Sequence, residues 1–231
     1  MAPEREAVWV DARRRRLHTV EADVCSVERR LASGELACPE CGGVLARWGW
    51  ARERVLRGPG SQRVRVRPRR ARCSGCGRSH VLLPVGLLVR RADQAVVIGA
   101  ALEAKARGLG HRQIAVALGR PETTVRGWLR RFASSAGPIR QRFTSLIVAV
   151  AGSSSPVLPA PAGSLLGDAV AAVLGAARAV AGRFAGRPAV EVLVNTVSAW
   201  SVACAVTDGL LLAPPSAAEM INTSWPLGAV M

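Results

Sequence analysis

The sequence predicts a mainly α-helical protein with one small β structure, and three observations lead to this fold class. Apolar residues recur at helical spacing on both sides of residue 150. Two Cys-x-x-Cys-Gly motifs enclose an alternating, arginine-rich segment. A stretch rich in Ser, Pro and Gly then separates two helical parts. We therefore expect a small β zinc ribbon, a three-helix helix-turn-helix domain and a C-terminal helical hairpin.

Residues 1–36 form the first predicted segment, whose helix lies within TVEADVCSVERRLASGE and ends at Gly34. The second segment, 37–84, contains the strongest motif, repeated as CPECGG and CSGCGR. A two-residue gap lets both thiolates face one cation, and the following glycine accommodates a positive φ. Four thiolates complete a closed tetrahedral site, which favours one structural Zn²⁺ ion over water-activating chemistry. The predicted ligands are Cys38, Cys41, Cys73 and Cys76.

Three other candidate ligands are interpreted differently. Cys25 and Cys204 stand alone in the sequence and are predicted to be small core residues. His80 either supports the metal site or simply belongs to a strand with the sequence HVLLP, and the strand is favoured.

The cysteine pairs are 31 residues apart, and this interval is predicted to form a long hairpin. Its arms are GVLARWGWARERVL and QRVRVRPRRARC, and GPG at 58–60 supplies the turn. Strand alternation places four arginines on one face, where they either contact phosphates or protect a solvated sheet edge. These residues are Arg63, Arg65, Arg67 and Arg69.

Residues 88–144 are predicted to contain three helices. The first is ADQAVVIGAALEAKARG, and GHRQIAVALGRPETTVRGWLRRF supplies the other two. Gly119 suits a left-handed turn between them, while Val125, Trp128 and Leu129 share the spacing of a buried face. This is the pattern of a helix-turn-helix, although a helical pair that packs only within its own domain would share much of it.

In a helix-turn-helix the second helix of the pair enters the DNA major groove. Thr and Arg near its start would reach base edges, and the last two arginines would contact phosphates. The preceding helix would touch the DNA backbone with its first turn. The residues predicted to contact DNA are Arg112, Gln113, Thr123, Thr124, Arg126, Gly127, Arg130 and Arg131.

Residues 152–163, GSSSPVLPAPAG, have the composition of a linker, and 164–231 are predicted to form a helical hairpin and tail. Ser164 is expected to cap the first helix, whose apolar stripe includes Val170, Val173 and Ala177, and Pro188 to open the second. The hairpin would either pack within the chain or form a homodimer. Its longest uncharged helical run, 192–207, is too short for a membrane span.

Positive charge is concentrated before the tail. Residues 1–144 hold 29 of the 32 basic and 12 of the 16 acidic residues. Such a field favours double-stranded DNA or another polyanion, although a merely soluble basic surface is the alternative. The start of the sequence shows no secretory signal, so we expect a cytoplasmic, nucleoid-associated protein with reduced cysteines.

The order of these motifs, from CPECGG through HVLLP to IAVALGRPETTVRGWLRRF, resembles two kinds of protein. One is an uncharacterised actinobacterial family of small zinc-ribbon and helix-turn-helix proteins, whose end also resembles INTSWPLGAV. The other is the N-terminal DNA-binding region of zinc-ribbon-bearing insertion-sequence transposases. The transposase resemblance implies recognition of terminal inverted repeats and a following catalytic domain with an acidic triad.

This chain departs from the transposase pattern, because only four acidic residues follow Ser145 in an Ala/Val-rich tail. We therefore expect no catalytic domain and no enzyme activity, and no small-molecule substrate is evident. The sequence predicts a sequence-specific DNA-binding regulator or mobile-element accessory. The alternative is an adaptor whose zinc ribbon binds a protein partner. RNA binding is disfavoured because aromatic residues for base stacking are scarce.

Overall fold

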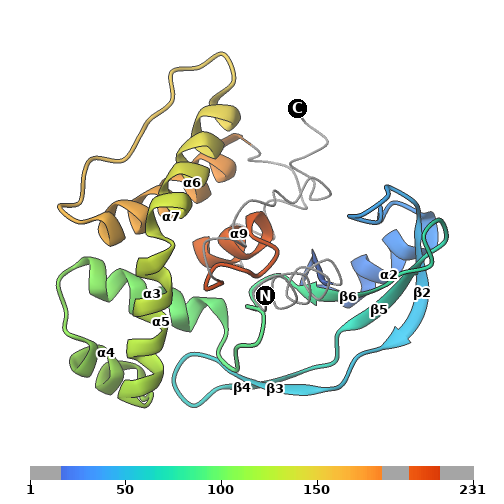
Figure 1. Cartoon of the computed structure of the whole chain (residues 1–231), viewed down its shortest axis with the longest axis horizontal. Helices are drawn as coiled ribbons and strands as arrows, with labels where there is room; N and C mark the ends of the chain where they lie inside the picture. The colour runs from blue at the N-terminus through green and yellow to red at the C-terminus, as the bar shows by residue number, and fades with distance from the viewer. Residues whose placement is uncertain (1–16, 184–197, 214–231) are drawn as a thin grey trace, which may run out of the picture.

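A computed structural model of the chain describes residues 17–183 and 198–213. In this part of the chain, seven helices accompany a small sheet of mixed strands and a two-stranded hairpin (Figure 1). The predicted class, mainly α with a small β structure, is confirmed at this level. The start of the predicted second tail helix, at Pro188, lies outside the described residues.

The four-stranded sheet has the order β1-β6-β5-β2. Strand β6 pairs in parallel with β1 and antiparallel with β5, which in turn pairs antiparallel with β2. Beyond this sheet, β3 and β4 continue the same long hairpin as a separate antiparallel pair. The strands are β1 (Leu17–Val20), β2 (Leu45–Trp50), β3 (Arg54–Arg57), β4 (Arg63–Val66), β5 (Arg69–Cys73) and β6 (Ser79–Pro84). The predicted hairpin and the strand at HVLLP are therefore present.

The N-terminal segment contains a strand as well as the predicted helix. Helix α2 (Val24–Ser33) begins after Asp23, whose carboxylate accepts hydrogen bonds from the backbone of its first turn, and ends at Gly34 with φ 75°. Strand β1 was not predicted, because four residues carry too little alternation to reveal a strand. The prediction that Cys25 is a core residue is wrong, since it lies exposed in the first turn of α2.

The remaining helices share one hydrophobic core. They are α3 (Ala95–Ala106), α4 (His111–Leu118), α5 (Glu122–Ser134), α6 (Ala136–Ala151), α7 (Leu165–Arg183) and α9 (Ala199–Val206). The three predicted helices of 88–144 are present as α3, α4 and α5. Helix α6 was not predicted; it begins within this segment and continues to Ala151, beyond the predicted boundary. Residues 152–163 contain no helix or strand, as expected of a linker.

Helix α7 packs along α6, so the tail joins the core of the preceding segment (Figure 1). The Ser164 hydroxyl accepts a hydrogen bond from the backbone of Gly167, and Val170, Val173 and Ala177 are buried, as predicted. Cys204 is also buried, as predicted. By length and composition alone α7 could cross a bilayer, although about half of it is buried within the protein. Dimerisation through this tail stays a prediction.

Trp200 of α9 lies directly over Gly99 of α3. Its indole Nε1 donates a 2.7 Å hydrogen bond to Glu103, and its ring meets Phe132 edge to face. A Cβ atom at Gly99 would lie 2.0 Å from the Trp200 ring. Only glycine therefore permits this close approach between α3 and α9.

Gly99→Ala is expected to destabilise the protein by about 1–3 kcal/mol, because the added methyl group must displace a packed indole. The control is Gly137→Ala in α6, where a Cβ would meet nothing within 4 Å. There the lower backbone entropy of alanine should stabilise the helix by about 0.5–1 kcal/mol. Urea unfolding of both variants measures the difference, and equal effects would contradict this packing.

Candidate metal centre and basic surface

The four predicted cysteine ligands meet at one point at the end of the β2–β5 pair. Their sulfur atoms all lie within 4.8 Å of one another. Sγ of Cys38 is 3.8 Å from that of Cys76, and Sγ of Cys41 is 3.4 Å from that of Cys73. Sulfur atoms around a tetrahedral zinc ion, with Zn–S bonds of about 2.3 Å, would be roughly 3.8 Å apart. The quartet therefore has the donor type, number and spacing of a closed metal site.

Both Cys-x-x-Cys turns have the same backbone pattern. The Gly42 and Gly77 N–H groups donate to the carbonyls of Cys38 and Cys73, respectively, and both glycines have a φ near 70°. This confirms the predicted role of the glycine that follows each pair. Gly43 is needed for a different reason, because a Cβ there would lie 3.0 Å from Cys73 Sγ.

The environments of the thiols differ within the quartet. Burial raises the pKa of the Cys38 thiol to about 12. The backbone N–H of Cys76, 3.5 Å from Cys73 Sγ, lowers the pKa of the Cys73 thiol to about 7. A metal ion must therefore displace a firmly held proton from Cys38, so metal affinity should fall as the pH falls.

His80 contacts the quartet from β6. Its side chain is fully buried, and Nε2 lies 3.4 Å from Cys38 Sγ, within hydrogen-bonding distance of sulfur. His80 therefore belongs to a strand, as favoured, and its side chain also contacts Cys38, one of the predicted ligands. A hydrogen bond at this position would stabilise the Cys38 thiolate when a metal binds.

Helices α4 and α5 are joined by a short turn that Gly119 makes possible. Gly119 has φ 59°, and its N–H donates to the carbonyl of Val116. Ile114 and Ala115 of α4 are buried together with the predicted core residues of α5, Val125, Trp128 and Leu129. The buried positions predicted for this helical pair are thus confirmed.

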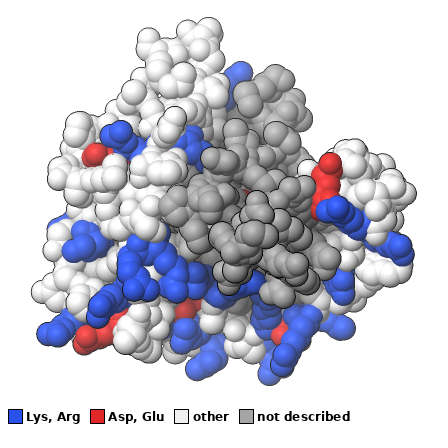
Figure 2. All heavy atoms as spheres, viewed as in Figure 1, with Lys and Arg blue, Asp and Glu red and all other residues white. Residues whose placement is uncertain are grey.

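The predicted contact residues of α5 lie away from this core. The exposed side chains are Thr123, Arg126, Arg130 and Arg131, while Thr124 and Gly127 are partly exposed. On α4, Arg112 pairs with Glu122 at 3.5 Å, and the Gln113 side chain accepts a hydrogen bond from Gly110. Figure 2 shows basic side chains gathered along the edge that carries α4, α5 and the β3–β4 hairpin.

The predicted face of four hairpin arginines is not continuous. Arg63, Arg65 and Arg67 are exposed, but Pro68 separates β4 from β5, so Arg69 belongs to the larger sheet. The Arg69 side chain is only 13% exposed, pairs with Glu28 at 2.8 Å and lies over the Trp50 ring. Arg69 therefore attaches α2 to the sheet, and its assignment to the exposed face was wrong.

A buried carboxylate joins the hairpin to the helices. Asp93, just before α3, accepts from Arg57 of β3 and from Arg120 of the α4–α5 turn, both at 2.6 Å. Arg120 also donates to the carbonyl of Gly58 at the hairpin turn, at 2.7 Å. The three charged groups form a connected network, which we call the Asp93 network. It holds the hairpin turn beside the α4–α5 turn.

The sequence reasoning missed this network. Asp93 is one of few acidic residues in a basic segment, and Arg120 stands between a turn glycine and Pro121. An isolated acidic residue in a basic segment and an arginine beside a turn both indicate charges with a structural role. The sequence does not show which residue each of them pairs with.

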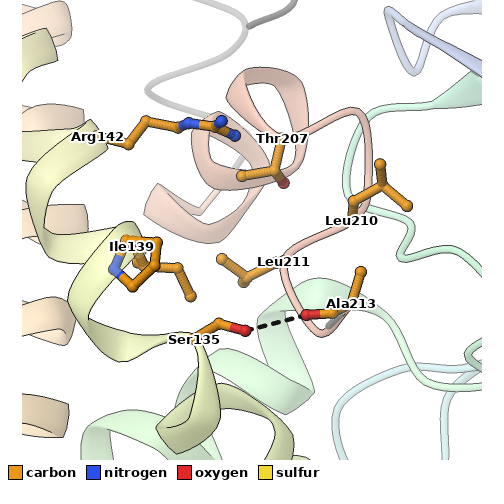
Figure 3. Close-up of a pocket in the computed structure, with 8 residues that line it drawn as sticks. Ser135, Ile139, Arg142, Thr207, Leu210, Leu211 and Ala213 are labelled. Atoms are coloured by element: carbon orange, nitrogen blue, oxygen red, sulfur yellow. Dashed lines mark hydrogen bonds between the residues drawn. The ribbon is translucent and has the colours of Figure 1, made fainter. Parts of the chain in front are cut away.

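The cavity in Figure 3 lies between α6 and the segment after α9. Ser135 donates a 3.0 Å hydrogen bond across it to the carbonyl of Ala213, and Arg142 extends from α6 toward Thr207. Its volume of about 10 Å³ is only enough for one water molecule. The contacts around it attach the tail to α6.

Comparison with known proteins gives one match. Residues 38–128 match the model of a domain of unknown function, DUF6431. The matched region begins at the first cysteine of the quartet and includes the hairpin, the Asp93 network and about half of α5. No curated protein and no solved structure is significantly similar to the chain.

Proposed function

We propose that this protein is a zinc-stabilised, sequence-specific reader of double-stranded DNA, acting as a transcriptional regulator or as a mobile-element accessory. In this proposal residues 37–84 form a zinc ribbon, and α4 and α5 form a helix-turn-helix unit with α5 in the major groove. The adaptor hypothesis is the weaker one, because it leaves the exposed arginines of α5 without a role.

The outward face of α5 carries the proposal. Val125 and Trp128 fix the helix to the core, while Arg126 and Arg130 are exposed and form no ion pair within the described residues. Thr123 adds a short polar side chain near the start of the helix. Arginine is the natural bidentate partner of guanine, and exposed arginines further along a recognition helix suit phosphates.

The first test is selection of bound sequences from a random duplex library with zinc-loaded protein at near-physiological salt. A defined motif would support the proposal, and a repeated motif with half-sites about 34–36 Å apart would indicate a dimer. Enrichment of no sequence, with binding that disappears as salt rises, would contradict specific recognition and favour the adaptor alternative.

Arg126→Ala is expected to relax base preference and to cost about 1–3 kcal/mol at a single base pair. Arg130→Ala should instead weaken binding to all duplexes alike and reduce the salt slope by about one. Arg178→Ala, an exposed change on α7, is the control. Fluorescence anisotropy on the selected and on random duplexes separates these effects. Equal losses on both duplexes from both variants would refute the assigned roles.

A further inference from the structure

Four arginines lie around the connection between β6 and α3, which pairs with β3 of the hairpin. Arg54 of β3 and Arg91 of the β6–α3 connection line the same small cavity. Arg90 precedes Arg91, and the positive charges of Arg131 on α5 and of Arg90 both act on Arg91. We call these residues the seam arginines.

The seam arginines differ from Arg57, Arg69 and Arg120, because they have no acidic partners within the described residues. Arg57 and Arg120 share Asp93, and Arg69 has Glu28. None of the ion pairs in the described ranges includes a seam arginine. The like charges therefore repel one another without compensation from a carboxylate.

Two further features raise the energetic cost of this cluster of like charges. The Nε atom of Arg91 is buried and has no hydrogen-bond partner in the described structure, and burial lowers the pKa of this guanidinium. Arg90 has a φ of 58°, a conformation that is unfavourable for a long side chain. Strain and unpaired charge gathered at one place are typical of a functional site, where a ligand supplies the missing interactions.

We propose that the seam arginines bind a phosphate group of the DNA backbone. The inference rests on the proposed function and deepens it. Guanidinium groups donate paired hydrogen bonds to phosphate oxygens, and the phosphate charge would relieve the repulsion among the arginines. A DNA strand that contacts both α5 and the β3–β4 hairpin would meet the seam, because α5 contributes Arg131 to it and the hairpin contributes Arg54. The seam arginines would therefore fix the orientation of the duplex relative to α5 and to the β3–β4 hairpin.

The test measures the affinity of zinc-loaded protein for a random-sequence duplex as a function of salt. Arg91→Ala and Arg131→Ala are each expected to lower the affinity several-fold at low salt. Each should also reduce the slope of log K against log salt by about 0.9, the value for one lost phosphate contact. The base preference found by selection should stay unchanged. Arg178→Ala on α7 should change neither quantity.

The outcomes separate the two proposals. If the wild-type protein binds no duplex, the proposed function and the phosphate site both fail. If it binds but both seam variants behave like Arg178→Ala, only the phosphate site is refuted. Thermal unfolding of Arg91→Ala checks that the variant is folded, and exposed Arg131 gives a second variant that does not disturb the interior.

Discussion

Removal of the metal is expected to unfold the four-stranded sheet and to leave the helical core folded. The sheet has a small core of its own, in which two of the buried residues, Cys38 and Cys73, belong to the cysteine quartet. The helices are held instead by a larger, separate cluster that includes Trp128, Phe132 and Trp200. A short segment with so small a core is expected to depend on a bound metal, because structural zinc supplies an apparent binding energy of about 10–16 kcal/mol.

Hydrogen exchange on chelator-treated protein measures this separation directly. Amides of β2, β5 and β6 should lose protection, those of α3 to α7 should keep it, and added Zn²⁺ should restore the first set. Cys41→Ser should reproduce the effect, and Cys25→Ser, which changes an exposed thiol outside the quartet, should not. Protected strands in metal-free protein would show that the sheet does not need the metal. Simultaneous loss of protection in the sheet and the helices would show that the metal does not act on the sheet alone.

Local signals in the sequence were enough to predict several parts of this structure. Gly34 and Gly119 end helices in the left-handed conformation expected of them, and each Cys-x-x-Cys-Gly motif forms its turn from adjacent residues. Such features depend on a few neighbouring residues, so periodicity and motif spacing reveal them. The four thiols could be assigned to one site because duplicated pairs require a common cation.

The features that escaped prediction depend on contacts between distant residues. Strand β1 is too short to show a pattern and exists because it pairs with β6, more than 60 residues later. The packing of α7 on α6 could not be distinguished from dimerisation, since an apolar stripe does not identify its partner. Single polar residues such as Asp93 carry no periodic signal, and their partners become evident only when the fold brings them together.

Asp93→Ala is expected to cause the largest loss of stability among changes outside the metal site, about 3–5 kcal/mol. The Asp93 side chain is 3% exposed and that of Arg120 is 6% exposed. Removal of the carboxylate leaves a buried guanidinium without its counter-charge, which costs far more than loss of a surface pair. Arg120 would then move toward solvent and release the carbonyl of Gly58, so the hairpin turn should loosen as well.

Glu53→Ala provides the matched control, because it removes the carboxylate of an exposed pair with Arg65 in the same hairpin. Its expected cost is about 0–1 kcal/mol. The double variant Asp93→Ala/Arg120→Met should recover part of the loss, since it removes the uncompensated charge together with its partner. Urea unfolding at a fixed zinc concentration compares the three proteins. If Asp93→Ala lowers the free energy of unfolding no more than Glu53→Ala does, the Asp93 network does not hold the hairpin to the helices. The exposed arginines of the hairpin and those of α5 would then be free to move relative to each other.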